Sequence, residues 1–199
     1  MSGIVLFLTL LLAGSAVHKS LARERLSVSA ARLVGGGPLA GVLVLAMAGT
    51  LELMAALALL ARDRDGPKPA FQLLNYPMLD DRTTSSADSP RGEWVWGTAA
   101  NRDCWSAYLG ATAPAKALLP SRAASLAGLP PAWVGCGTLD LFHPECEAYA
   151  QRLRDSGVRC EWVSVERAYH GFDVSAPRAE ISRDYFESQM RALREAFGL

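Results

Sequence analysis

The chain of 199 residues begins with an apolar part and continues with a longer part in which strand-like and helix-like patterns of apolar and polar residues follow one another. Residues 1–61 contain two apolar stretches, 3–17 and 33–61, separated by a short segment that carries several Lys and Arg. A membrane-spanning helix needs about 20 apolar residues, so the second stretch is long enough and the first is marginal. A signal-peptide core is the weaker interpretation of the first stretch, because no positive charge precedes it. Hydropathy therefore favours an apolar helical, membrane-spanning segment over residues 1–61, with the basic loop on the cytoplasmic side.

Residues 51–64 also fit a second interpretation, a Leu- and Ala-rich helix of ordinary length packed against a sheet. Glu52 is the one charged residue between positions 33 and 61. It would be costly and functional inside a membrane, whereas in a soluble fold it could lie near a helix start. The charged run 62–65, followed by Gly66 and Pro67, ends a helix and begins a loop. We therefore expect an apolar helical segment over residues 1–61 and a separate domain over residues 62–199.

The later part of the chain alternates between strand and helix patterns. Residues 70–76 are a mainly apolar run that Pro77 ends, as expected for a buried strand. Residues 132–137 predict another strand, 145–156 an amphipathic helix closed by Gly157, and 159–165 the next strand. A crossover of this length implies parallel pairing. A last helix over 179–197 carries one apolar stripe. The expected class is α/β, a parallel sheet with flanking helices.

Two polar residues follow the last two predicted strands. Parallel sheets place functional groups in the loops at the C-terminal ends of their strands, where Asp140 and His170 stand. An Asp that orients a later His is the order of the last two members of an esterase triad. An Asp after a strand is also a common helix cap, and a lone His is often structural. Aromatic residues at positions 94–108 fit either a pocket wall or a satellite core.

Short stretches around these residues carry a family resemblance. They read NYPMLD at 75–80, LPPAW at 129–133, GTLD at 137–140, AYAQRL at 148–153 and HGF at 170–172. Together they resemble the hormone-sensitive-lipase-like esterases of the α/β-hydrolase fold, and residues 55–64 resemble the helix that follows that family's nucleophile. The resemblance implies a C-terminal half of such an esterase, with Asp140 and His170 as the acid and base. The apolar helices of the first 60 residues weakly resemble DoxX-like membrane proteins.

The expected nucleophile is missing, because the chain contains no Gly-x-Ser-x-Gly. The family would place it near residues 46–52, where the chain has Thr50 but no serine, and Thr50 lies off the expected position. Gly35, Gly36 and Gly37 look superficially like an oxyanion loop, but no His precedes them and they are too near the elbow position. We expect a truncated, fused or frame-shifted hydrolase with impaired activity. The alternative is a small integral membrane protein with a non-catalytic hydrolase-derived extension.

Composition narrows the possible partners. Positive and negative side chains balance at 20 each, so no basic surface for nucleic acid is expected. Cys104, Cys136, Cys146 and Cys160 match no zinc or redox spacing, which predicts free thiols, no metal and no cofactor. The expected partners are a small-molecule ester, if the chain is active, and a membrane contacted through residues 1–61. The location, membrane-associated or cytoplasmic, stays open.

Overall fold

A parallel β-sheet organises the computed structural model, which describes residues 44–46, 51–85, 91–92, 94–109 and 119–199. Within these residues the strands are β1 (Val44–Ala46), β2 (Phe71–Asn75), β3 (Ala132–Gly137) and β4 (Cys160–Val165), and they lie side by side in chain order. Crossovers that contain helices join them, as parallel pairing requires. The expected α/β class with a parallel sheet is confirmed.

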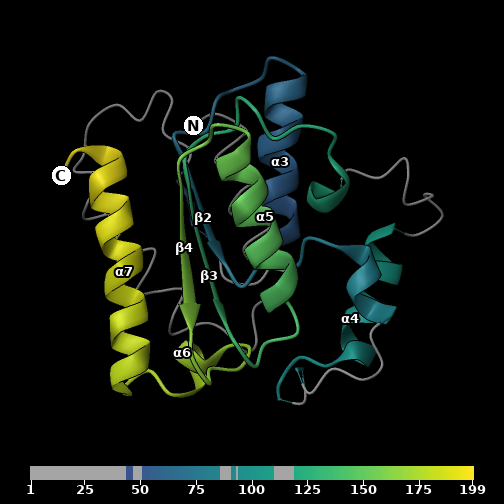
Figure 1. Cartoon of the computed structure of the whole chain (residues 1–199), viewed down its shortest axis with the longest axis vertical. Helices are drawn as coiled ribbons and strands as arrows, with labels where there is room; N and C mark the ends of the chain where they lie inside the picture. Colours follow the sequence, from purple (N-terminus) through teal and green to yellow (C-terminus); the bar gives the residue numbers. More distant parts are fainter. Residues whose placement is uncertain (1–43, 47–50, 86–90, 93, 110–118) are drawn as a thin grey trace, which may run out of the picture.

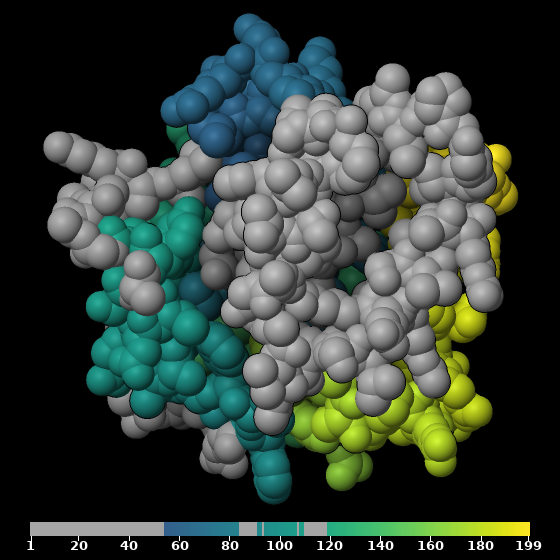
Figure 2. Space-filling view, turned by 180° about the vertical axis from the view of Figure 1, so that it is seen from behind, coloured from purple at the N-terminus to yellow at the C-terminus, as the bar shows by residue number. Residues whose placement is uncertain are grey.

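Helices cover both faces of the sheet. Figure 1 shows α3 (Leu51–Asp63) and α5 (His143–Asp155) on one side and α7 (Glu180–Phe197) on the other. Shorter elements are α4 (Thr98–Leu109), α6 (Phe172–Ser175) and the 3-10 turns η1 (Asp81–Ser85) and η3 (Pro120–Arg122). Seen from behind in Figure 2, the α7 end and the α4 region again lie on opposite sides of the molecule. The expected strands and helices from residue 70 onward are confirmed to within two residues.

The prediction of a membrane span over residues 33–61 is wrong for the part of it that the structure describes. That part contains a strand, β1, and a separate 13-residue helix, α3. Helix α3 buries Ala55, Ala58 and Leu59 in the common core, while Leu57 is 38% exposed. Within the described ranges no helix is both long and apolar enough to cross a membrane. The alternative interpretation, a Leu/Ala helix packed on a sheet, is the correct one.

The expected division of the chain at residue 61 falls inside α3. Strand β1 pairs with β2, so residues 44–46 and 51–61 belong to the same α/β unit as the residues that follow. Ala55, Ala58 and Leu59 of α3 pack in the common core, and a helix that is buried in a core can be as apolar as one in lipid. The predictions for residues 1–43, including the first apolar stretch and Gly35 to Gly37, lie outside the described residues.

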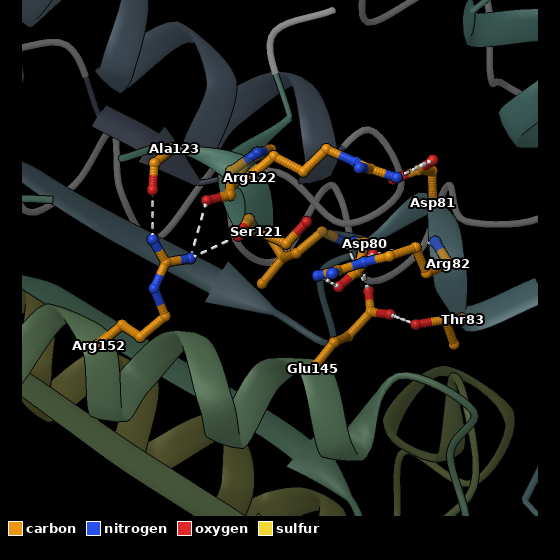
Figure 3. Close-up of polar contacts among 11 residues, drawn as sticks. Asp80, Asp81, Arg82, Thr83, Ser121, Arg122, Ala123, Glu145 and Arg152 are labelled. Atoms are coloured by element: carbon orange, nitrogen blue, oxygen red, sulfur yellow. Dashed lines mark hydrogen bonds and ion pairs between the residues drawn. The ribbon is translucent and has the colours of Figure 1, made fainter. Parts of the chain in front are cut away.

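Two polar side chains on one face of α5 hold the loops beside it (Figure 3). The carboxylate of Glu145 accepts hydrogen bonds from the backbone N–H of Leu79 and Asp80, at 2.5 and 3.3 Å, and from the hydroxyl of Thr83. Two turns later, Arg152 donates to the carbonyls of η3, with 2.7 Å to Ser121 O. Helix α5 is therefore hydrogen-bonded to both η1 and η3.

A bidentate ion pair closes this arrangement between the two turns. Arg122 of η3 donates to both carboxylate oxygens of Asp81 in η1, at 2.7 and 2.8 Å. Bidentate pairs of this kind have a fixed geometry. The segment that leaves the C-terminal end of β2 is thus tied to α5 and to η3, on the side of the sheet where α5 lies (Figure 3).

Candidate active site

Asp140 lies in the short connection between β3 and α5, at the C-terminal end of β3. Its backbone N–H donates to Gly137 O at 3.0 Å, and its side-chain Oδ1 accepts the backbone N–H of Phe142 at 3.0 Å. The residue is fully buried. These two bonds form a local turn of the type that Asp residues favour, and they leave the second carboxylate oxygen for another partner.

His170 lies in the connection that follows β4, and its Nδ1 is 2.9 Å from Asp140 Oδ2. Both residues are buried, so this bond is shielded from water and stronger than the same bond on a surface. A carboxylate accepts hydrogen bonds only, so in a bond to an Asp carboxylate the proton lies on Nδ1 of the imidazole and Nε2 is left for another partner. The structure therefore brings together the two residues that the sequence singled out.

Gly137, at the end of β3, allows the two connections to approach each other. A Cβ at this position would lie 2.1 Å from the carbonyl oxygen of Ala168, which precedes the histidine by two residues. Two backbone bonds join the loops here, from Thr138 to Val165 O and from Leu139 to Ala168 O, at 2.9 and 3.0 Å. The approach of the two loops that carry Asp140 and His170 thus depends on a contact that only glycine permits.

Aromatic side chains surround the imidazole. The ring centroid of His170 lies 4.5 Å from that of Tyr76, 5.4 Å from that of Trp96 and 5.5 Å from that of Phe142. Trp96 therefore lies against the imidazole, whereas Trp105 and Tyr108 contact each other in the core. The core interpretation of residues 94–108 thus holds for Trp105, and the pocket wall stays a prediction.

Tyr76 and Phe142 are neighbours of the site that the sequence did not mark as functional. Phe142 follows Asp140 by two residues, so its nearness could have been expected from the turn. Tyr76 is 64 to 94 positions away from the pair in the chain. Its one sequence signal was its place at the end of a predicted strand, where the C-terminal ends of parallel strands meet.

The junction where the family places its nucleophile lies between β1 and α3. Strand β1 ends at Ala46 and α3 begins at Leu51, so a strand-to-helix connection does occur at the expected place. Residues 47–50 themselves, including Thr50, lie outside the described residues. A strand and a helix therefore flank this connection, as they flank a nucleophile elbow, while the serine of the elbow is missing from the sequence.

Other polar groups near the site have structural contacts. His143 Nε2 is 2.8 Å from Ser164 Oγ, its ring contacts Trp162, and burial lowers its pKa. All four cysteines are free thiols, and burial raises the pKa of Cys146 and of Cys160 to about 11. In the described part of the chain no group of His, Cys, Asp and Glu is arranged to hold a metal ion.

Comparison with known proteins agrees with this geometry. The model of the α/β hydrolase fold family matches residues 48–174, more than half of the chain, so the chain belongs to that family. Carboxylesterase NlhH of Mycobacterium tuberculosis is 33% identical over 135 residues, which cover 61% of this chain and 40% of NlhH. Esterase LipI of the same organism is 32% identical over 123 residues, 59% of this chain and 38% of LipI.

Solved structures give the same picture. Esterase LipW from Mycobacterium marinum superposes with a TM-score of 0.64 at 39% identity, over 72% of this chain and 46% of LipW. A bacterial heroin esterase gives a TM-score of 0.61 at 32% identity, over 71% of this chain and 47% of that structure. The chain spans about 40% of the length of the curated relatives it matches and under half of these structures. The resemblance to α/β-hydrolase esterases is confirmed, whereas the DoxX-like resemblance and a membrane partner gain no support.

Proposed function

We propose that this chain carries the acid and base of a serine-esterase site, Asp140 and His170, and that it hydrolyses small carboxylic esters only weakly because it lacks the nucleophilic serine. The hydrogen bond of 2.9 Å between His170 Nδ1 and Asp140 Oδ2, at the C-terminal ends of adjacent parallel strands, is the observation that supports it. In such a site the Asp holds the imidazole in one tautomer. The other ring nitrogen takes a proton from a serine hydroxyl and returns it to the leaving alcohol.

The missing nucleophile can be assigned to a position by spacing. A Gly-x-Ser-x-Gly motif laid over residues 46–50, between β1 and α3, would have its serine at Ala48 and its glycines at Ala46 and Thr50. Ala48 has no hydroxyl, so His170 has no proton to accept there. On this assignment Thr50 replaces a glycine of the elbow and is not the nucleophile.

A direct test restores the motif with Ala46→Gly, Ala48→Ser and Thr50→Gly together. The parent chain should hydrolyse short p-nitrophenyl esters no faster than its His170→Ala variant. The restored chain should react with a fluorophosphonate at position 48, and adding His170→Ala should slow that reaction by about 100-fold or more, the contribution of a general base. Adding His143→Ala serves as the matched control and should leave the labelling rate essentially unchanged, because His143 is bonded to Ser164 instead.

Two outcomes would contradict this proposal. If the restored chain is labelled equally fast with and without His170, the pair has no role as acid and base. If the parent chain hydrolyses esters substantially and Thr50→Ala, Asp140→Ala and His170→Ala each abolish the activity, Thr50 is the nucleophile and the assignment of Ala48 is wrong.

A further inference from the structure

Tyr76 has an unusual backbone conformation beside the proposed site. It directly follows β2, and its φ is +41°, in the left-handed region. A bulky residue is strained there, and a residue that precedes a proline, as Tyr76 precedes Pro77, is further restricted to extended conformations. Strained residues of this kind persist only where their surroundings over-determine them, and they gather at functional sites.

Hydrogen bonds hold both the backbone and the side chain of Tyr76. Its backbone N–H donates to Gly135 O at 2.6 Å, which continues the pairing of β2 with β3 by one residue. Its phenol donates to Asp173 Oδ1 at 3.2 Å. The side chain is 1% exposed, and burial together with the charge of Asp173 raises the pKa of the phenol well above its usual value. The hydroxyl therefore stays protonated and remains a donor.

Two contacts of the Tyr76 side chain involve the segment that carries His170. The phenol ring meets the imidazole edge to face, with centroids 4.5 Å apart and an angle of 61° between the planes. Asp173, which holds the hydroxyl, lies on α6 and follows His170 by three residues. Tyr76 thus contacts the histidine directly and fastens the helix that comes immediately after it.

The hydrogen bond to Asp140 does not by itself fix the orientation of His170. One bond at Nδ1 leaves the ring free to tilt and to turn about the direction of that bond, which would displace Nε2. Packing against the faces of the imidazole ring restricts this tilting and turning. Proton transfer needs that restriction, because a misplacement of the order of 1 Å can lower the rate by about 100-fold. Tyr76 has the closest ring contact with His170 among the aromatic neighbours described.

We infer that Tyr76 and Asp173 form a positioning pair that holds the imidazole of His170 in the orientation needed for proton transfer. The inference rests on the function proposed above, because it concerns the same histidine. Neither residue is catalytic on this account, since both act through His170. Removing the phenol hydroxyl should leave the Asp140–His170 bond in place but let the imidazole and α6 move more freely.

The chain contains a matched control for a purely structural role. Tyr185 is a second buried phenol, and its hydroxyl donates to Asn75 Oδ1, one residue before Tyr76. Its ring contacts Trp133 and Phe172. Removing this hydroxyl breaks a buried hydrogen bond of the same type at the same end of β2, without touching the ring face of His170.

The test measures how fast the Nδ1–H proton of His170 exchanges with water, by nuclear magnetic resonance on the full chain. We expect Tyr76→Phe and Asp173→Ala each to accelerate exchange by about tenfold, as for the loss of one buried hydrogen bond. The double variant should exceed neither single variant by more than about twofold, because both changes break the same bond. Tyr185→Phe should leave the exchange rate near that of the parent chain.

Exchange that is unchanged in a folded Tyr76→Phe variant would overturn the inference, and so would equal acceleration by Tyr185→Phe, which would indicate general loosening. If Tyr76→Phe does not fold, Asp173→Ala decides alone, because it removes the acceptor of the same bond from the less buried partner. Failure of the proposed function has a different signature: Asp140→Asn would then leave the resonance and its exchange rate unchanged.

Discussion

The two halves of the proposed serine-hydrolase site differ sharply in this chain. At the ends of β3 and β4, Asp140 and His170 are buried and hydrogen-bonded to each other, and a contact at a glycine allows their loops to approach each other. At the junction of β1 and α3 a strand and a helix stand on either side, as around a nucleophile elbow, but the sequence between them offers no serine. The scaffold of a reaction and the atom that performs it are thus separable features, and one can be present without the other.

The contact at Gly137 should give the largest loss when it is disturbed. Gly137→Ala places a Cβ against the carbonyl of Ala168, in backbone that cannot yield easily. We expect a loss of roughly 3 kcal/mol in the free energy of unfolding, as for overpacking of a tight core. Urea denaturation measures it.

Gly157→Ala is the control for Gly137→Ala, because Gly157 has positive φ but a Cβ added there would meet no atom within 4 Å. That substitution should cost about 1 kcal/mol, the backbone penalty alone. Similar losses for the two variants would mean that the acid and base half is no more tightly packed than an open turn, and the contrast between the two halves would weaken.

Glu145 should make stability depend on pH through the helix that follows Asp140. Burial raises the pKa of its carboxyl to about 8, so the folded chain favours the neutral acid, in contrast to the unfolded chain. Because the pKa of Glu145 is raised in the folded chain, its contribution to the free energy of unfolding is fully present below the ordinary pKa of 4.5. That contribution is lost as the pH rises from 4.5 toward 8, where the unfolded chain ionises the group and the folded chain does not. We expect a decline of the order of a few kcal/mol across that interval.

Glu145→Gln should abolish this decline. Its amide can accept from Leu79 and Asp80 and donate to Thr83, so the three contacts survive without a titrating group. Glu145→Ala leaves two backbone N–H groups without their acceptor and should cost about 2 kcal/mol at pH 5. Unfolding free energies of the parent chain and both variants at pH 5 and pH 8 check these values, and a difference between the parent and Glu145→Gln that does not change with pH would refute them.

The smallest effect is expected on the nucleophile side, on the outer face of α3. Leu57→Lys should change the free energy of unfolding by less than about 0.5 kcal/mol, since Leu57 is an exposed residue of a helix that packs on a sheet. Ala58→Leu, one residue later and buried, should cost about 2 kcal/mol by overpacking. The reverse order of these two effects would mean that α3 does not pack as the structure places it.

Sequence patterns located most of the fold beyond residue 69, and they failed before it for a physical reason. Residues 132–137 and 145–156 carry clear strand and helix periodicities, because one face of each element meets the core and the other does not. The stretch 33–61 contains almost no charged or strongly polar residue. Its periodicity therefore could not distinguish a buried strand followed by a helix packed on the sheet from one membrane helix. An apolar composition indicates that a segment is buried, but it does not indicate whether protein or lipid surrounds the segment.

The sequence by itself determined the order of Asp140 and His170, their places after predicted strands and the absence of a Gly-x-Ser-x-Gly motif, because these depend on residue type and local periodicity alone. Only the tertiary structure decided that His170 Nδ1 lies 2.9 Å from Asp140 Oδ2 and that Gly137 allows the two loops to come this close. It also decided that the ring of Tyr76 contacts the imidazole. These contacts join segments that lie 30 to 94 positions apart in the chain. Their geometry depends on strand register and close packing, which no local pattern of residues encodes.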